Sequence, residues 1–451
     1  MKKLIVISTL LLALLFMTVP AAFGQIATYN TGFQVQNLSD TNTATIDITY
    51  YNQDGSVDTT VTDTIAAGSS KTYFPIDATV GFNGSVVISA DQSVAAITNI
   101  LGDGLAFGAS YESFSSGAGE VSLPLIMKAN SGFNTRFNVQ NAGGAATDVT
   151  IDYSNSTCSD SITGLQPGAA ATRDQLDNTC LPAGYVGSAT VTAGAGGSVV
   201  ATVLEVGPDT LFAYNGFTGG STSPVMPLVN ANNSGFITGI QVQNAGAAAT
   251  DVTLNYTPVT GLGTACSETK TVAAGESETF ALYAFTFAGD PNPGTDNCAF
   301  GLTFVGGATA SQSGSEPLVT IVNQLNIAAA KGAAYNGFDP TAAADTVVMP
   351  LIMDRNSNFW TGFNIQNAGS GNATVTCDFV QSNGSNNSSA TSPSLAAGEA
   401  WNHLQLNQLG DGWVGSATCS GGAGSSLLAV VNELQTGAAG DQFFAYTAFG
   451  Q

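Results

Sequence analysis

Charge is scarce in this sequence, and positive charge most of all. Of the 451 residues, 9% are charged, and 32 Asp and Glu outnumber 9 Lys and Arg, which gives a net charge of −23. Binding to nucleic acid requires clustered basic side chains that neutralise phosphates. The basic residues are scattered singly after the N-terminus, so we expect no nucleic-acid partner.

Histidine and the common catalytic motifs are also nearly absent. The chain has one histidine, His403, whereas a Ser-His-Asp hydrolase needs such a base beside a nucleophile. We interpret His403 as a packing or surface residue, because it occurs in only one of the repeats described below. No GxSxG, HExxH or phosphate-binding loop stands in a suitable setting. The sequence therefore predicts a protein that is not an enzyme and has no catalytic residues.

A long apolar run occurs only at the N-terminus. Lys2 and Lys3 precede the run Leu4–Val19, and small residues follow it at 20–24. This pattern is typical of a secretory signal peptide cut before Gln25, and about 16 apolar residues are short for a membrane span. We expect residues 1–24 to be a signal peptide. The mature chain is then extracellular or at the cell surface, without a membrane span.

The rest of the chain repeats one unit four times. A first motif ends in Gln-Asn and appears as GFQVQN (32–37), RFNVQN (136–141), GIQVQN (239–244) and GFNIQN (362–367). Each copy continues with an alternating run such as TDVTIDY, a turn ending in Gly, a segment such as GSATV, an apolar run, and a Tyr three residues before a Phe. Four copies in one order indicate tandem duplication.

Each unit has the pattern of a set of β-strands. In Val149–Tyr153 apolar and polar residues alternate with the period of two that a half-buried strand requires. About seven short strands in about 100 residues are typical of an immunoglobulin-like sandwich. A β-propeller or solenoid is the alternative, although repeats of those folds are usually shorter. The predicted fold is all-β, with four tandem immunoglobulin-like β-sandwich domains at 25–119, 120–220, 221–343 (with enlarged loops) and 344–451.

The motifs FxVQNxG, TDVTIDY, LxPG and GSATV, in this order, resemble the CARDB-type and related immunoglobulin-like repeats of exported bacterial surface proteins. The resemblance extends over all four units and rests on turns and core strands. It implies an array of sandwiches at the cell surface, and it implies no activity.

The six cysteines fall two to a unit in the second, third and fourth units. An even number in an exported chain favours disulfides, and the repeat pairs them as Cys158–Cys180, Cys266–Cys298 and Cys377–Cys419. Aligning the units puts Cys377 and Cys419 at the places of Ile151 and Val191. Because a disulfide requires Cα atoms about 4.4–6.8 Å apart, we predict that Ile151 and Val191 lie in contact on neighbouring strands.

Two places are candidates for binding. The loop that contains Asp290 and Asp296 is rich in oxygen atoms that suit calcium, and a polar loop without a metal is the alternative. We expect no other cofactor. Trp401 stands where the other units have Lys71, Ala171 and Glu278, which indicates a solvent-facing position. An exposed aromatic residue can stack on sugar rings or anchor a protein partner, and local packing is the alternative.

A Pro-centred apolar segment occurs three times for four units, at 123–127, 226–229 and 349–353. It could end one unit or begin the next, and in either case one terminal unit lacks it and has an unpaired sheet edge. If it ends a unit, the fourth unit is open, and residues 25–30 of another molecule could fill the edge and build a head-to-tail filament. The alternative is that this start has the same role in its own first unit.

These patterns predict a secreted, non-enzymatic structural or adhesive cell-surface protein, which could be the subunit of an extracellular filament or layer. Its expected partners are other copies of itself or cell-surface polymers. The alternative is an array of carbohydrate- or protein-binding modules with the contacts in the fourth unit.

Overall fold

The computed structural model describes residues 26, 28–282, 285, 294–299, 301–383, 387–435, 437 and 439–451. This part of the chain consists of strands and loops, with one 3-10 turn, η1 (Pro340–Ala342). No helix in it is long and apolar enough to cross a membrane. The predicted all-β sandwich class is confirmed. The predicted signal peptide, 1–24, lies outside the described residues.

The strands of the first two units follow the repeat. The first unit contains β1 (Tyr29–Asn37), β2 (Ala44–Asn52), β3 (Val57–Ile65), β4 (Ser70–Tyr73), β5 (Gly84–Ala90), β6 (Val94–Gly102) and β7 (Phe107–Glu112). The second unit contains β8 (Glu120–Lys128), β9 (Asn134–Asn141), β10 (Thr147–Tyr153), β11 (Ser159–Leu165), β12 (Ala170–Asp174), β13 (Tyr185–Ala193), β14 (Val199–Val206) and β15 (Leu211–Asn215).

The third and fourth units repeat the same order with small additions. The third contains β16 (Val225–Ala231), β17 (Ile237–Asn244), β18 (Thr250–Pro258), β19 (Cys266–Val272), β20 (Ser277–Phe280), β21 (Thr295–Asp296), β22 (Phe304–Gln312), β23 (Leu318–Asn326) and β24 (Lys331–Asn336). The fourth contains β25 (Thr346–Asn356), β26 (Phe359–Asn367), β27 (Ala373–Gln381), β28 (Ser388–Leu395), β29 (Ala400–Leu404), β30 (Trp413–Ser420), β31 (Leu427–Gln435), β32 (Phe443–Thr447) and β33 (Phe449–Gly450).

The strands of a unit form two layers around an apolar core. In the second unit the layers are β11-β10-β13-β8 and β12-β9-β14-β15, and in the third they are β16-β22-β18-β19-β21 and β20-β17-β23-β24. The fourth unit joins its two layers through β25 and β26. In the second unit the first strand, β8, lies beside the sixth, β13, whereas the constant-type immunoglobulin order places the first strand beside the second. That each unit is a separate domain stays a prediction.

The alternation that predicted strands is visible as burial. Along β10 every second side chain is buried. Ile151 is the register partner of Val191 on β13, and neither side chain has exposed surface. The predicted contact between these two residues is confirmed.

The asparagine that ends the first motif holds the following turns. In the second unit Asn141 is 1% exposed, its Nδ2 donates to the carbonyl oxygens of Ala145 and Leu165 at 2.8 Å, and its Oδ1 accepts from the backbone N–H of Gly143 at 2.8 Å. Equivalent bonds are made by Asn37, Asn244 and Asn367. A buried amide needs such partners. The asparagine therefore recurs in every unit because its side chain holds the turns that follow the first motif.

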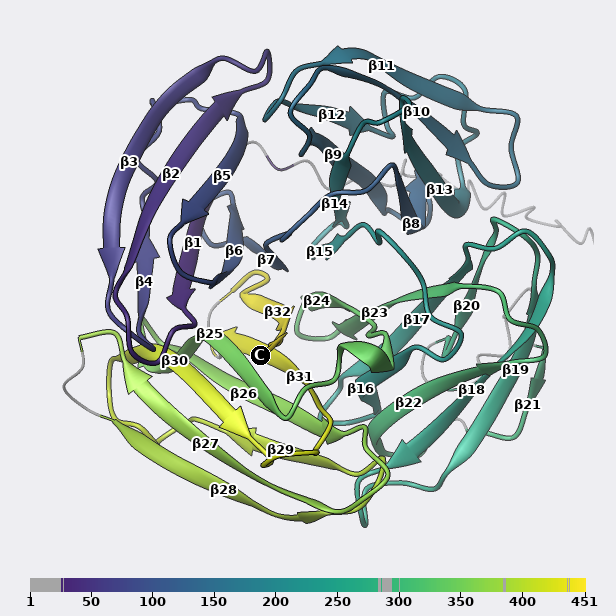
Figure 1. The fold of residues 1–451 in the computed structure, drawn as a ribbon. Helices are drawn as coiled ribbons and strands as arrows, with labels where there is room; N and C mark the ends of the chain where they lie inside the picture. The colour runs from purple at the N-terminus through teal and green to yellow at the C-terminus, as the bar shows by residue number, and fades with distance from the viewer. Residues whose placement is uncertain are drawn as a thin grey trace, which may run out of the picture.

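The four units surround a common centre, where β7, β15, β24 and β32 lie close together (Figure 1). The tandem repeat suggests a row of sandwiches, but the fourth unit packs on the first. Gln34 Nε2 of the first unit donates to the carbonyl oxygen of Pro350 in the fourth at 2.9 Å. The arrangement is therefore a closed ring.

One recurring bond explains two of the repeated motifs. The serine of the Gly-Ser segment donates to the carbonyl oxygen of the Gly-ended turn in the next unit. Ser188 Oγ reaches Gly275 at 2.8 Å, and Ser416 Oγ of the last unit reaches Gly68 of the first at 3.5 Å. Ser85 makes the same bond to Gly168.

The Pro-centred segments begin units and do not end them. They form β8, β16 and β25, which pair with β13, β22 and β30 of their own units. The fourth unit is thus complete, and the prediction that a start segment from another molecule fills its edge is wrong. The alternative role for residues 25–30 is also wrong, because Tyr29 and Asn30 pair with β6 inside the first unit. Among the described residues, β5 pairs on one side only, with β2.

Candidate functional site

The centre of the ring uses one aligned residue from each unit. The position after the closing tyrosine of the repeat ends β7, β15, β24 and β32, and it holds Glu112, Asn215, Asn336 and Thr447. Asn215 Nδ2 donates to the carbonyl oxygen of Glu112 at 2.8 Å, and the Asn215 backbone N–H donates to Asn336 Oδ1 at 2.9 Å. The backbone N–H of Thr447 donates to the Glu112 carboxyl group. These bonds connect the innermost strands of all four units.

A second set of contacts lies at the junctions between units, on β6, β14, β23 and β31. Adjacent residues on a strand point to opposite sides, so one contacts the preceding unit and its neighbour contacts the following unit. Asn99 Nδ2 donates to Glu433 Oε2 at 3.0 Å, which joins the first unit to the fourth. Asn323 Nδ2 donates to Glu205 Oε2 at 2.7 Å, which joins the third unit to the second.

The other two junctions use different chemistry at the same aligned positions. Gln324 and Asn432 bond to each other through both amides at 3.0 Å, which joins the third unit to the fourth. Ile100 and Leu204 belong to one apolar cluster between the first and second units. Each junction is therefore either polar on both sides or apolar on both sides, as burial requires.

Asp441, in the loop before β32, binds the other three units at once. Its carboxylate accepts from the backbone N–H groups of Leu211 at 2.8 Å and Gly332 at 2.9 Å. Its own backbone N–H donates to the carbonyl oxygen of Ala106 at 2.6 Å. Lys331 Nζ donates to the neighbouring Gln442 and Gly440. This loop fastens the fourth unit to the rest of the ring.

Large and small side chains alternate around the centre. Phe444 of the fourth unit lies over Gly108 of the first, and Phe212 of the second lies over Gly332 of the third. A Cβ atom added to Gly108 would stand 2.3 Å from Phe444 Cζ, and one added to Gly332 would stand 2.4 Å from Phe212 Cζ. The phenylalanines fit only because glycine faces them.

Burial changes the acidity of the central carboxyl groups. It raises the pKa of Glu205 and of Glu433 to about 8, and the pKa of Asp441 also to about 8. It raises the pKa of Glu112 as well. The Oε1 atoms of Glu205 and Glu433 have no hydrogen-bond partner among the described residues, which suits the neutral acid. The three groups with a pKa of about 8 expose at most 1% of their surface, so they join units and do not face a substrate.

Trp401 lies on β29, an edge strand beside β26, and is half-buried. Its ring packs edge-on against Phe363, with centroids 5.6 Å apart, and is tilted over His403 at 4.8 Å. Burial lowers the pKa of His403. Trp401 and His403 thus lie side by side in one aromatic row. Part of the Trp401 side chain remains exposed to solvent.

The candidate calcium loop is only partly described. Asp290 lies outside the described residues, and Asp296, on β21, accepts a hydrogen bond from the backbone N–H of Cys298. No group of three or more His, Cys, Asp or Glu side chains within the described ranges could hold a metal ion. Calcium binding stays a prediction.

The disulfides join the pairs that the repeat alignment predicted. Cys158–Cys180, Cys266–Cys298 and Cys377–Cys419 have Cα separations of 5.6, 5.0 and 3.9 Å. Cys377 and Cys419 are register partners on β27 and β30. Three disulfides indicate an oxidising, non-cytoplasmic environment.

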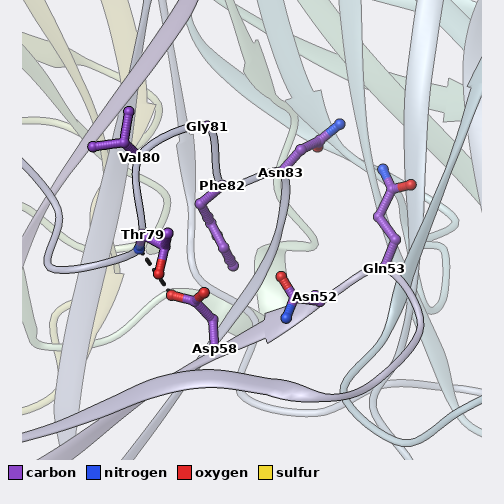
Figure 2. A pocket seen from close by; sticks show the side chains of 8 residues that line it. All are labelled: Asn52, Gln53, Asp58, Thr79, Val80, Gly81, Phe82 and Asn83. Atoms are coloured by element: carbon purple, nitrogen blue, oxygen red, sulfur yellow. Dashed lines mark hydrogen bonds between the residues drawn. The ribbon is translucent and has the colours of Figure 1, made fainter.

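The first unit has a hollow of about 310 Å³ between the end of β2 and the loop 79–83. Figure 2 shows Asp58 and Phe82 pointing toward it and Val80 pointing away. The backbone N–H of Thr79 donates to Asp58 Oδ2 at 2.9 Å. Asp58 is the one ionisable side chain of the lining, so the hollow offers polar contacts without the second group that acid–base catalysis needs.

A second hollow, of about 380 Å³, lies where the first three units meet. Its lining includes the phenylalanines that close three repeats, Phe114, Phe217 and Phe338, together with Asp339. This hollow is therefore a gap at the contact between the first three units.

No protein-family model matches the chain, and no curated protein is found to be similar to it. The resemblance to CARDB-type repeats therefore stays a prediction. The sequence analysis missed the junction residues, although the Glu at 205 and 433 occupies the same place in two units.

Proposed function

We propose that the chain is a secreted, non-enzymatic structural or adhesive protein of the cell surface. The main support for this proposal is that polar residues at recurring positions join the units to one another. Buried amides and carboxyl groups at aligned positions join four units into one closed body, and disulfides hold three of the units internally. Such a body suits a durable role outside the cell, as one unit of a filament or layer.

Electron microscopy of native surface material with a specific label tests this role. The proposal expects labelled assemblies, either fibres or a layer, in contact with the cell. Label found only on free molecules in the medium would contradict it.

The second candidate function is carbohydrate or protein binding through the fourth unit. It is favoured by the accessible part of Trp401, because an aromatic ring held by its neighbours can stack on a sugar ring with little loss of side-chain entropy. The test compares Trp401→Ala with Leu404→Ala, which removes a 47% exposed side chain from the other face of β29. Glycan or cell-wall binding that only Trp401→Ala abolishes supports this function. Equal binding by both variants contradicts it.

A further inference from the structure

The hollow at the end of β2 lies where a later unit carries a disulfide. In the third unit Cys266 is the register partner of Tyr256 and is linked to Cys298 in the loop before β22. In the first unit the partner of Tyr50 is Thr59, and this unit contains no cysteine. The covalent link of the third unit is therefore replaced in the first unit by other contacts.

One hydrogen bond holds the loop 79–83 of the first unit to β3. The backbone N–H of Thr79 donates to Asp58 Oδ2 at 2.9 Å. Between this loop and the end of β2 a space of about 310 Å³ remains. The first unit thus has an open hollow at the place that a disulfide closes in the third.

An aromatic residue that the other units bury faces this hollow. The first residues of β13, β22 and β30 are aromatic and at most 7% exposed, and they are Tyr185, Phe304 and Trp413. The strand registers give Phe82 the same place before β5, but Phe82 is partly exposed. Its ring lies edge-on to Tyr50, with centroids 5.7 Å apart, and points toward Asp58 and Asn52 (Figure 2).

The rest of the lining is mostly polar and offers no positive charge. Asn52, Gln53 and Asn83 supply amide groups, Thr79 supplies a hydroxyl group and Asp58 a carboxylate. Gln53 and Asn83 are exposed, so their amide groups can bond to a ligand. An amide donates and accepts hydrogen bonds, as a sugar hydroxyl group does. None of the described lining residues is basic, so an anionic ligand would meet the carboxylate without a compensating charge.

We propose that this hollow binds one neutral sugar residue. The C–H face of the sugar ring packs on Phe82, and its hydroxyl groups bond to the surrounding amides and to Asp58. One aromatic ring beside a few polar groups suits a ligand with an apolar face and a polar edge. The volume of about 310 Å³ is at the small end for ligand sites, so the hollow holds a single ring. The site is separate from Trp401, and the proposal does not rest on the surface role.

A titration of the purified protein by saturation-transfer NMR tests this site. The probes are glucose, galactose, mannose and N-acetylglucosamine, with glucuronic acid as the anionic comparison. At least one neutral sugar should bind with a Kd of about 1 mM, as expected for a ligand of this size. Glucuronic acid should bind about tenfold more weakly than that sugar, because its carboxylate faces Asp58.

Two substitutions in the lining locate the binding. Asn83→Ala removes an exposed amide and should weaken binding about tenfold. Asp58→Asn keeps an oxygen that accepts from the backbone N–H of Thr79, and it should also weaken binding about tenfold, because hydrogen bonds to a charged group are stronger. The matched control is Asn42→Ala, which removes an exposed amide just before β2, at the far end of this strand. This control and Trp401→Ala should bind as the wild type does.

Three results would each overturn the proposal. They are no saturable binding of any of the four neutral sugars, equal binding of glucuronic acid, and wild-type binding by Asn83→Ala or by Asp58→Asn. Binding that is lost in Trp401→Ala but kept in Asn83→Ala would assign the sugar to the fourth unit and so contradict a site in the first. None of these outcomes affects the test of the surface role by microscopy.

Discussion

Glu433 makes the stability of the ring depend on pH. Its pKa is 4.5 in an ordinary environment and about 8 in the folded protein, so the folded state holds a proton that the unfolded state has lost between these pH values. The contribution of Glu433 to stability is therefore complete below about pH 4.5 and is lost as pH rises through about 8. At 1.36 kcal/mol for each pKa unit, the loss is about 4 kcal/mol at pH 8, where half of the folded molecules have also released the proton.

The substitution Glu433→Gln removes the charge and keeps an oxygen that accepts from Asn99. The buried amide N–H groups of the new side chain cost about 1–3 kcal/mol at every pH. We therefore expect the variant to be less stable than the wild type at pH 4 and more stable at pH 8. The difference between the two proteins should change by about 4 kcal/mol over this range, because the amide cost cancels.

Chemical denaturation at pH 4, 6 and 8, monitored by two probes to establish cooperative unfolding, measures this change. Glu120→Gln is the control, since Glu120 is exposed at the start of β8 and loses the same charge. Its curve should run parallel to that of the wild type. Parallel curves for Glu433→Gln as well would refute the argument that this carboxyl group is buried and neutral in the ring.

Three other substitutions test separate parts of the structure. Gly108→Ala should lower stability by about 1–3 kcal/mol through the clash with Phe444, whereas Gly239→Ala, with nothing within 4 Å of the added Cβ, should not; equal thermal midpoints would contradict this packing. Tyr335→Phe should lower the free energy of unfolding by about 2 kcal/mol in denaturant titrations, because both backbone groups of Leu228 lose their partner. An unchanged free energy of unfolding would refute the role of the tyrosine hydroxyl. Replacing Cys377 and Cys419 together by Ala should cost about 3–4 kcal/mol for a loop of 42 residues, and an unchanged denaturation midpoint would count against a structural disulfide.

The strands and the disulfides were predictable because each depends on local or repeated sequence. Alternation in Val149–Tyr153 predicts the buried face of β10, and alignment of Cys377 and Cys419 with Ile151 and Val191 predicts two neighbouring strands. These inferences need one unit only.

The closure of the ring was not predicted, because it depends on pairs of residues in different units. Glu433 and Asn99 are ordinary members of two strands until the fourth unit is placed against the first. A signal existed on β14 and β31, where Glu205 and Asn432-Glu433 interrupt otherwise apolar runs. Buried polar residues at the same aligned place in several repeats indicate contacts between repeats.

The position of the Pro-centred segment was left open for a physical reason. A segment at a junction can pair in either direction, and its sequence does not state which sheet receives it. The structure decides it, because the segment pairs with β13, β22 or β30 of the unit that follows it. The tyrosine hydroxyl explains why proline and tyrosine recur together.

Small-angle X-ray scattering of the purified protein in solution tests the closed ring most directly. A compact body of this length should have a radius of gyration of about 22 Å. Four sandwiches in an extended row would give about twice that value or more. A compact radius with a pair-distance distribution of a single globular body agrees with closure, and an elongated profile for the monomer would contradict it.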